Sequence, residues 1–484
     1  MLALSDPALL RADAFVGGAW LAAARGARFA VRNPANGEIL AEVADLDAAD
    51  TRAAIEAAAA AQAPWAARTA KARSALLMRW YGLIMRAQED LARLMTAEQG
   101  KPLAETRGEV AYGASFIQWF AEEAKRAYGD VIPSHVDGRR ILVLKRPVGV
   151  TAAITPWNFP NAMITRKCGP ALAAGCAFLI KPAQETPLSA LALAELAERA
   201  GIPPGVFNVV PSTQAAAVGR EMTESPLVRK FSFTGSTPVG KTLMAQCAST
   251  VKKVSLELGG NAPFIVFDDA DLDRAAEGAL ASKYRNMGQT CVCANRFLVQ
   301  ADVFDAFAAG LEAKVKAMKV GDGMEDGVAQ GPLINEAAVV KVERLLADAL
   351  AKGAKVTLGG HRHALGGTYF EPTMVTGVTP AMDMFNQEIF GPVASLTQFE
   401  DEAEAVRLAN DTPFGLASYF YARDLARVFR VAEALEYGMV AVNDGILSTE
   451  VAPFGGVKES GLGREGSKYG LEEYLEPKYV LLAL

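Results

Sequence analysis

The chain has 484 residues, of which 51% are hydrophobic and 21% charged, an ordinary globular composition that excludes extensive disorder. Its 49 basic and 55 acidic side chains leave a formal net charge of −6 at pH 7, so no global positive field attracts nucleic acid or an anionic membrane surface. A chain of this length exceeds one ordinary hydrophobic core, and we expect two or three domains.

The N-terminal segment, residues 1–15, lacks a basic stretch followed by a sustained apolar run. No secretory signal is therefore predicted, and we expect a cytoplasmic protein that binds neither nucleic acid nor a membrane. An odd number of cysteines without an export signal argues against a disulfide framework. The five are Cys168, Cys176, Cys247, Cys291 and Cys293. His361 and His363 share a glycine-bounded loop without acidic or thiol neighbours, so no metal site is predicted.

The first third of the chain predicts helices, because residues 47–125 are rich in alanine. One of these helices covers residues 72–99 and ends before the sequence GKP that begins at Gly100. Strands and helices then alternate from Val150. Expected strands cover residues 150–155, 177–181, 206–210 and 229–234, and expected helices follow from about residues 161, 187, 213 and 236. This alternation predicts right-handed crossovers and a parallel, doubly wound sheet.

The helix that begins at Pro187 has the clearest predicted start. Thr186 is expected as its N-cap and proline occupies its first position, while Gly201 is expected to end it.

A second alternating stretch covers about residues 258–440. It includes an apolar strand at 264–267, a long helix at 336–352 and a strand at 438–442. Two further strand-like segments lie far apart, at 128–150 and 474–484. Exposed strand edges are prone to unwanted association, so we expect these two segments to pair with each other and with another subunit.

Three short segments carry reactive or polar side chains in settings that suggest chemistry. Cys291 stands in the sequence GQTCVC, Glu257 in LELGGN and Asn158 in TPWNFP. Each has a simpler interpretation, since a lone cysteine is usually buried and inert, a glutamate can cap a helix, and a proline-rich loop can be a turn. Together they provide a nucleophile, a base and an N–H donor, which aldehyde oxidation requires beside a hydride acceptor.

The chain resembles the aldehyde dehydrogenase superfamily over nearly its full length, from the sequence FVGG at Phe15 to the C-terminus. Six motifs occur in the order of that family, at residues 155–160, 233–236, 257–261, 288–291, 388–392 and 453–456. The resemblance implies an α/β fold with a Rossmann-type dinucleotide-binding domain, an α/β catalytic domain and a small β oligomerisation arm. The implied boundaries are 1–123 with 148–257, then 258–440, and 124–147 with 471–484. It also implies a homotetramer or homodimer joined through the arm.

The resemblance also implies roles for single residues. Cys291 is the expected nucleophile and Glu257 the expected base, and the Asn158 side chain with the Cys291 backbone N–H is the expected oxyanion hole. Lys181 is expected on the adenosine ribose and Glu388 on the nicotinamide ribose. The implied cofactor-binding residues are Ile154, Thr155, Pro156, Trp157, Lys181, Ala183, Gln184, Phe233, Gly235, Ser236, Leu258, Glu388 and Phe390.

The nucleotide site does not carry the usual glycine fingerprint. Residues 233–240 (FTGSTPVG) follow a strand and open a helix, whose N–H groups can face a pyrophosphate, but alone this pattern is a weak signal. Gln184 stands where an acid would repel a 2′-phosphate, so we expect NADP with NAD tolerated. Glu185 could replace that acid, and Ser212, where many relatives have glycine, leaves the adenine contacts open.

Within the superfamily the chain is most similar to succinate-semialdehyde dehydrogenases, in residues 157–167, 283–296 and 461–474. By this resemblance Arg166, Arg285 and Ser448 bind the distal carboxylate, and arginine forks match carboxylates well. The alternative is that each arginine is a salt-bridged surface or interface residue. Glutarate semialdehyde, one methylene longer, is the alternative substrate, because one methylene changes the discrimination between substrates by only about 1–3 kcal/mol.

Two other functional classes share part of this pattern. A CoA-acylating enzyme would also use Cys291, but such relatives usually lack the glutamate at position 257. A non-catalytic protein on the same scaffold would have lost Cys291, Glu257 or Asn158, and all three are present. Cys293 could form a regulatory disulfide with Cys291 if the loop bends, or it could be a small buried packing residue.

Overall fold

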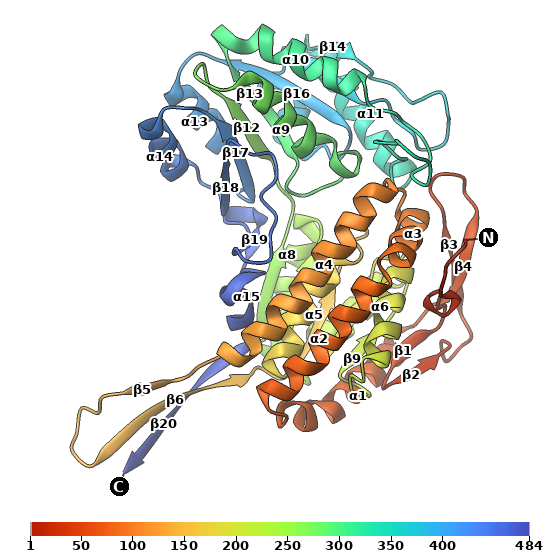
Figure 1. Cartoon of the computed structure of the whole chain (residues 1–484), viewed down its shortest axis with the longest axis vertical. Helices are drawn as coiled ribbons and strands as arrows, with labels where there is room; N and C mark the ends of the chain where they lie inside the picture. The colour runs from red at the N-terminus through yellow and green to blue at the C-terminus, as the bar shows by residue number, and fades with distance from the viewer. Residues whose placement is uncertain (1, 484) are drawn as a thin grey trace.

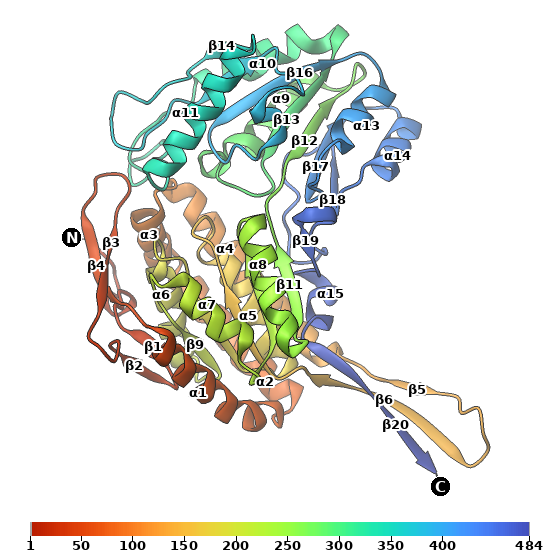
Figure 2. The ribbon, with the colours of Figure 1, turned by 180° about the vertical axis from the view of Figure 1, so that it is seen from behind.

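The computed structural model describes residues 2–483, and it contains two large sheets with helices on both faces and a thin arm that projects from one end (Figures 1 and 2). The first sheet has eight strands, and its central strands are parallel. Its order is β19 (Gly461–Leu462), β11 (Lys253–Glu257), β10 (Val228–Thr234), β7 (Val150–Ile154), β8 (Phe178–Lys181), β9 (Phe207–Val209), β1 (Ala14–Val16) and β2 (Ala19–Leu21).

Helices cover both faces of the first sheet, as Figures 1 and 2 show from opposite sides. One face carries α2 (Ala70–Arg86), α3 (Gln88–Gln99), α4 (Leu103–Glu123), α5 (Ala162–Ala174) and α6 (Pro187–Arg199). The other carries α1 (Ala48–Ala66), α7 (Ala215–Glu224) and α8 (Thr237–Cys247). The predicted continuous helix over 72–99 is wrong: Ala87 leaves helical geometry, with φ −92° and ψ 11°, so α2 and α3 pack separately against α4.

The second sheet has seven strands, parallel except at β14. Its order is β14 (Lys355–Leu358), β15 (Thr373–Thr376), β16 (Val393–Phe399), β13 (Ala294–Gln300), β12 (Ala262–Val266), β17 (Ala417–Tyr421) and β18 (Met439–Val442). Side chains alternate along β12, so Phe264 and Val266 enter one core and Ile265 the other. The helices around this sheet are α9 (Leu272–Tyr284), α10 (Phe304–Lys316), α11 (Glu336–Ala351), α12 (Asp383–Asn386), α13 (Glu402–Asn410) and α14 (Leu425–Ala434).

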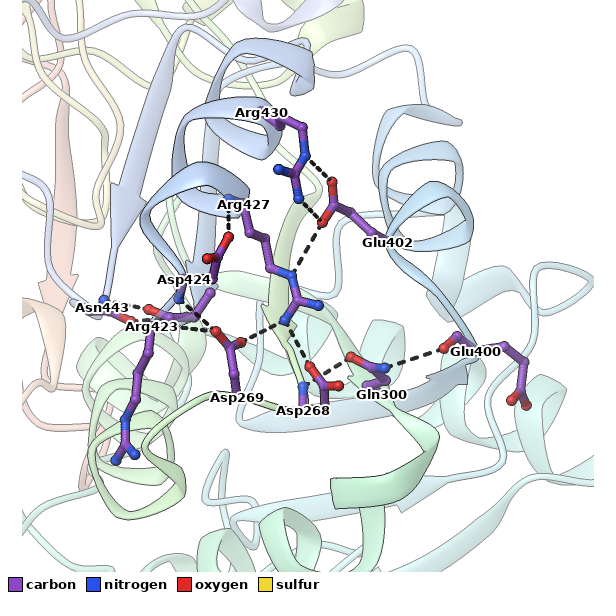
Figure 3. A network of polar contacts seen from close by, with 11 residues as sticks. Asp268, Asp269, Gln300, Glu400, Glu402, Arg423, Asp424, Arg427, Arg430 and Asn443 are labelled. Atoms are coloured by element: carbon purple, nitrogen blue, oxygen red, sulfur yellow. Dashed lines mark hydrogen bonds and ion pairs between the residues drawn. The ribbon is translucent and has the colours of Figure 1, made fainter.

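Arg427 links α14, the segment after β12 and α13 beside the second sheet (Figure 3). It lies on α14 and contacts Asp268 at 2.7 Å and Asp269 at 2.6 Å, both just after β12. It also pairs with Glu402 on α13 at 3.2 Å and lies 4.8 Å from the Phe267 ring centroid. A charge shared among several partners holds geometry better than an isolated surface pair.

The projecting arm consists of β5 (Asp130–Ile132), β6 (Arg139–Pro147) and β20 (Leu475–Ala483). The predicted pairing of the two distant segments is confirmed, because β20 runs antiparallel to β6 from Leu475 opposite Pro147 to Ala483 opposite Arg139. α15 (Ser467–Glu472) leads into β20, and β3 (Arg28–Arg32) with β4 (Ile39–Ala44) forms a separate hairpin. The domain boundaries and the assembly role of the arm stay predictions.

The start of α6 differs from its predicted cap. Proline stands first in the helix as expected, but the Thr186 side chain makes no capping hydrogen bond. Glu98, the buried penultimate residue of α3, accepts instead from the backbone N–H groups of Leu188 and Ser189, each at 2.8 Å. A carboxylate at a helix N-terminus satisfies groups that otherwise lack partners.

Within residues 2–483 no helix is long and apolar enough to cross a membrane.

We predict that Glu98→Ala lowers the thermal unfolding midpoint by roughly 2–10 °C, because it leaves two buried N–H groups of α6 without an acceptor. Differential scanning calorimetry measures the change. Glu56→Ala, which removes an exposed glutamate from α1, is the control and should unfold like the wild type. Equal midpoints for Glu98→Ala and the wild type would show that α6 does not depend on this carboxylate.

Candidate active site

The three predicted catalytic side chains line one cavity of about 240 Å³. Asn158 comes from the loop after β7, Glu257 is the last residue of β11, and Cys291 lies in the loop before β13. Because β7 and β11 belong to one parallel sheet, their carboxyl ends meet at one edge, where α/β proteins usually bind ligands. The second sheet brings the cysteine loop to that edge.

The cysteine loop has an unusual backbone. Asn286, Met287 and Gly288 all have positive φ, at 52°, 55° and 74°. Non-glycine residues rarely adopt this conformation, and strained backbone persists where the surroundings hold it in place. Gly288 cannot be replaced easily either, since an added Cβ would lie 2.1 Å from the Gly391 carbonyl oxygen. The loop therefore holds Cys291 in one position.

Cys291 is half-buried, whereas the other four cysteines are buried and all five are free. Burial raises the pKa of its thiol to about 12, and the Arg166 guanidinium acts in the opposite direction. The thiol is therefore protonated at neutral pH, and a base must take its proton before it can act as a nucleophile.

The Asn158 side chain is fixed beside this loop. Its amide N–H donates to the Gln289 carbonyl oxygen at 3.1 Å, and the residue is only 3% exposed. A side-chain amide carries two N–H donors, so one remains for a ligand oxygen while the other sets the plane of the amide. This geometry fits the predicted oxyanion donor.

Glu257 is buried, and its Oε2 atom has no hydrogen-bond partner among the described residues. Burial raises its pKa well above the usual value, and the neighbouring Glu465 raises it further, while Arg166 and Lys167 lower it. A carboxyl group with a raised pKa is suited to accept and release protons near neutral pH.

Glu465, which the sequence did not reveal, forms ion pairs with two buried cations of α5. Its carboxylate pairs with the Arg166 guanidinium at 2.8 Å and with the Lys167 ammonium. Arg166 also lies 3.8 Å from the Phe454 ring centroid. No local sequence pattern marks this cluster, because Lys167 and Glu465 are 298 positions apart.

The predicted carboxylate-binding residues are not equivalent. Arg166 is buried and paired with Glu465, whereas half-buried Arg285 forms no ion pair within residues 2–483. Arg285 lies 5.4 Å from the Phe159 ring centroid. Tyr112, also missed from sequence, has a buried hydroxyl without a hydrogen-bond partner, and Arg166, Arg285 and Ser448 all lie close enough to affect its pKa.

The cavity also fits the nicotinamide end of a dinucleotide. Its other predicted residues are Pro156, Trp157, Gly235, Ser236, Leu258, Glu388 and Phe390, and Lys341 joins them. Glu388 accepts from the Gly260 N–H at 3.1 Å and faces Gly259, where a Cβ would lie 3.2 Å from Glu388 Oε2. The Thr155 and Thr234 hydroxyls are buried without partners within the described chain, and such atoms can bind a ligand.

The remaining predicted cofactor residues lie outside this cavity. Gln184, with Glu185, Arg32 and Thr213, lines a separate hollow of about 240 Å³. The Lys181 ammonium donates to the Pro182 carbonyl oxygen at 3.2 Å, and burial lowers its pKa to about 8. Ile154, Thr155, Ala183 and Phe233 do not line either space.

Cys293 is buried, and its thiol donates to the Lys283 carbonyl oxygen at 3.5 Å. This contact fits the packing interpretation, and a disulfide with Cys291 stays a prediction. Across residues 2–483 no group of three or more His, Cys, Asp or Glu side chains is placed to hold a metal ion.

Comparisons with known proteins identify the family of this site. The model of the aldehyde dehydrogenase family matches residues 20–480. The chain is 64% identical over 479 residues to a glutarate-semialdehyde dehydrogenase of Pseudomonas aeruginosa, covering 99% of each. It is 62% identical over 481 residues to the NADP(+) succinate-semialdehyde dehydrogenase GabD of Escherichia coli, covering 99% of this chain and 100% of the relative.

A third relative and a solved structure are similar to the chain over nearly its whole length. The chain is 62% identical over 482 residues to a 3-sulfolactaldehyde dehydrogenase of Pseudomonas putida, covering 100% of this chain and 99% of the relative. The crystal structure of an NADP-dependent enzyme of E. coli, 62% identical, covers 100% of both chains with a TM-score of 0.99. The predicted α/β fold class is confirmed.

We predict that iodoacetamide modifies Cys291 before the other four cysteines, because only Cys291 is half-buried. Arg166→Met should slow this modification by on the order of tenfold, the effect of one pKa unit, because it removes the cation that lowers the pKa of the thiol. Peptide mass spectrometry over a range of pH measures the rate. Arg73→Met, near Cys176 instead, is the matched control. An unchanged rate in Arg166→Met would exclude this electrostatic coupling.

Proposed function

The chain belongs to the aldehyde dehydrogenase family, and from that premise we propose that it oxidises succinate semialdehyde to succinate with NADP as the hydride acceptor. The observation that carries this proposal is the single cavity lined by Cys291, Glu257 and Asn158. These side chains provide a nucleophile, a base and an oxyanion donor for one reacting carbon.

The reaction begins at Cys291. The half-buried Cys291 thiol gives up its proton to solvent, and the thiolate attacks the aldehyde carbon to form a thiohemiacetal oxyanion. The free N–H of the Asn158 amide donates to the oxygen that becomes negatively charged. After oxidation to the thioester, Glu257 takes a proton from the attacking water, and the acid is released.

The dinucleotide would be held by residues at the ends of β7, β10 and β11. Trp157, Gly235 and Glu388 line the nicotinamide end, beside Thr234, whose hydroxyl has no hydrogen-bond partner within the described chain. When bound, the cofactor supplies the hydride acceptor.

Support for NADP comes from the second hollow and from a relative. Gln184 is neutral and shares that hollow with Arg32, a cation that can attract a 2′-phosphate. Glu185 lies there too and would favour NAD, which we propose as the tolerated cofactor. The 62% identical E. coli relative is named as NADP(+)-dependent.

Support for an anionic aldehyde comes from the residues around Arg285. Half-buried Arg285, which forms no ion pair within residues 2–483, is available to bind a distal carboxylate, and the Tyr112 hydroxyl, which has no hydrogen-bond partner there, offers a further donor. Arg166 contributes less directly, because Glu465 already neutralises part of its charge.

Glutarate semialdehyde is the second candidate substrate, because the 64% identical relative is named for it. Both aldehydes carry a carboxylate, and sulfolactaldehyde, named in a third relative, carries a sulfonate instead. The shared feature is an anionic group at a distance from the aldehyde, which is the feature that Arg285 can recognise.

We also propose a cytoplasmic homotetramer or homodimer joined through the arm. Apolar side chains of the arm, among them Leu144, Tyr479 and Leu481, are exposed in the single chain. A partner subunit that covered them would remove an exposed strand edge.

The proposal is tested by the absorbance of reduced nicotinamide when the protein is mixed with each aldehyde and either dinucleotide. Succinate semialdehyde with NADP should give the highest kcat/KM, and Cys291→Ala should give none. A clear preference for glutarate semialdehyde, for sulfolactaldehyde or for an uncharged aldehyde would replace the proposed substrate.

We predict that Arg285→Ala lowers kcat/KM for succinate semialdehyde by at least about 30-fold, because losing one partner of a desolvated charge pair costs about 2–5 kcal/mol. The loss for butanal, which has no carboxylate, should be small. Steady-state kinetics with both aldehydes measures the difference, and Arg274→Ala, an arginine on the neighbouring α9, is the control. Equal losses for both aldehydes would mean that Arg285 has only a structural role.

Glu257→Gln should separate the two halves of the reaction, because an amide cannot take the proton of the hydrolytic water. We expect a burst of reduced cofactor followed by a steady phase at least about tenfold slower than the wild type, within the range of general base catalysis. Stopped-flow absorbance measures both phases. If burst and steady rates fall by the same factor, Glu257 acts mainly on the Cys291 thiol.

A further inference from the structure

Lys101 is a fully buried lysine that lies directly behind the oxyanion loop. Its ammonium donates to the Asn158 backbone carbonyl oxygen at 2.6 Å and pairs with the Glu109 carboxylate at 2.5 Å. It also lies 3.9 Å from the centroid of the Phe159 ring. The ammonium therefore contacts two successive residues of the loop that carries the oxyanion donor.

The partner of Lys101 holds the other end of the same loop. The second oxygen of Glu109 accepts from the backbone N–H groups of Asn161 at 3.0 Å and Ala162 at 3.3 Å, at the start of α5. Both oxygens of this carboxylate are thus used. The Lys101–Glu109 pair fastens residues 158–162 to α4 and to the segment before it.

Asn286 links this support to the cysteine loop. Its side-chain amide donates to the carbonyl oxygens of Asn158 at 2.9 Å and Gln289 at 3.2 Å. The Gln289 carbonyl oxygen is also the acceptor of the Asn158 side-chain amide. Lys101 and Asn286 therefore share one acceptor, and through it the oxyanion residue and the nucleophile loop are fixed relative to each other.

Burying the Lys101–Glu109 ion pair costs free energy because both charges lose their water, so close hydrogen-bond partners must replace that water. A buried ammonium is tolerated only where close partners replace its water, and the Asn158 carbonyl is one of only two hydrogen-bond acceptors of the Lys101 ammonium within the described chain. A helix cap alone would need Glu109 and no lysine. The lysine is explained by the carbonyl that it contacts.

We propose that Lys101 is a positioning residue, which holds the Asn158 backbone so that the side-chain amide points at the oxygen of the reacting aldehyde. This inference rests on the proposed roles of Asn158 and Cys291 and is independent of the substrate's distal group. Lys101 does not touch the substrate and acts through Asn158.

The test uses Lys101→Met, which keeps the length of the side chain and removes the donor. The kcat should fall by about 10–100-fold, since an error of about 1 Å in placing a reacting group can cost 10²-fold. The factor should be the same for succinate semialdehyde and butanal, and the Kd for NADP should change by less than about twofold. Lys230→Met, which removes an equally buried ammonium from its pair with Glu473, is the matched control and should keep its kcat.

A double-mutant cycle distinguishes positioning from general stability. In an Asn158→Ala background, Lys101→Met should lower kcat by less than about twofold, because the group through which it acts is already gone. If the two losses multiply, or if Lys101→Met folds and keeps its kcat, the proposal is overturned. A wild type that oxidises butanal but not succinate semialdehyde overturns only the proposed substrate.

A second variant covers failure to fold. Lys101→Met combined with Glu109→Gln leaves no buried charge unpaired and keeps an acceptor for the Asn161 N–H. The same loss of kcat and the same non-additivity with Asn158→Ala are expected. Wild-type kcat in this folded variant would overturn the proposal.

Discussion

The arrangement of the active site depends on the ion pairs that the buried Glu465 carboxylate forms with two cations. This carboxylate forms ion pairs with Arg166 and Lys167, both on α5. These contacts join the helix that follows the oxyanion loop to the segment after β19. Two cations around one carboxylate leave one positive charge, and Arg166 and Lys167 lower the pKa of the buried Glu257 carboxyl, which burial and Glu465 raise. Removing either cation would leave Glu465 with a single partner and would raise the pKa of Glu257 further. A structural ion cluster and the acid–base chemistry are therefore parts of one electrostatic system.

The fold was predictable where local pattern decides it. β7 and β8 are largely apolar runs bounded by turn residues, and β7, β8, β9 and β10 each begin and end within one residue of the expected positions. Prediction failed where alanine gives no signal, since nothing around Ala87 marks the break between α2 and α3. It also failed at Thr186, because the acceptor that caps α6 comes from Glu98, about 90 positions away.

The site divides in the same way. Cys291, Glu257 and Asn158 stand in short motifs with glycine or proline neighbours, so the sequence reveals them. Their supports do not, since Lys101 meets Asn158 across 57 positions and has no motif of its own. Arg166 and Arg285 are indistinguishable in sequence, and only the position of Glu465 shows that Arg166 is paired, whereas Arg285 forms no ion pair within residues 2–483.

The arm has a consequence for how the chain reaches its mature form. β20 is the outer strand of a three-stranded ribbon, and its unpaired edge extends along Leu475–Ala483 (Figure 2). Within the described residues β20 pairs only with β6, so its other edge is exposed in the single chain. A single chain thus exposes an unpaired strand edge that can associate with other strands before the subunits assemble. Recovery from denaturant would then pass through an optimum of protein concentration, with slow association below it and disordered aggregation above.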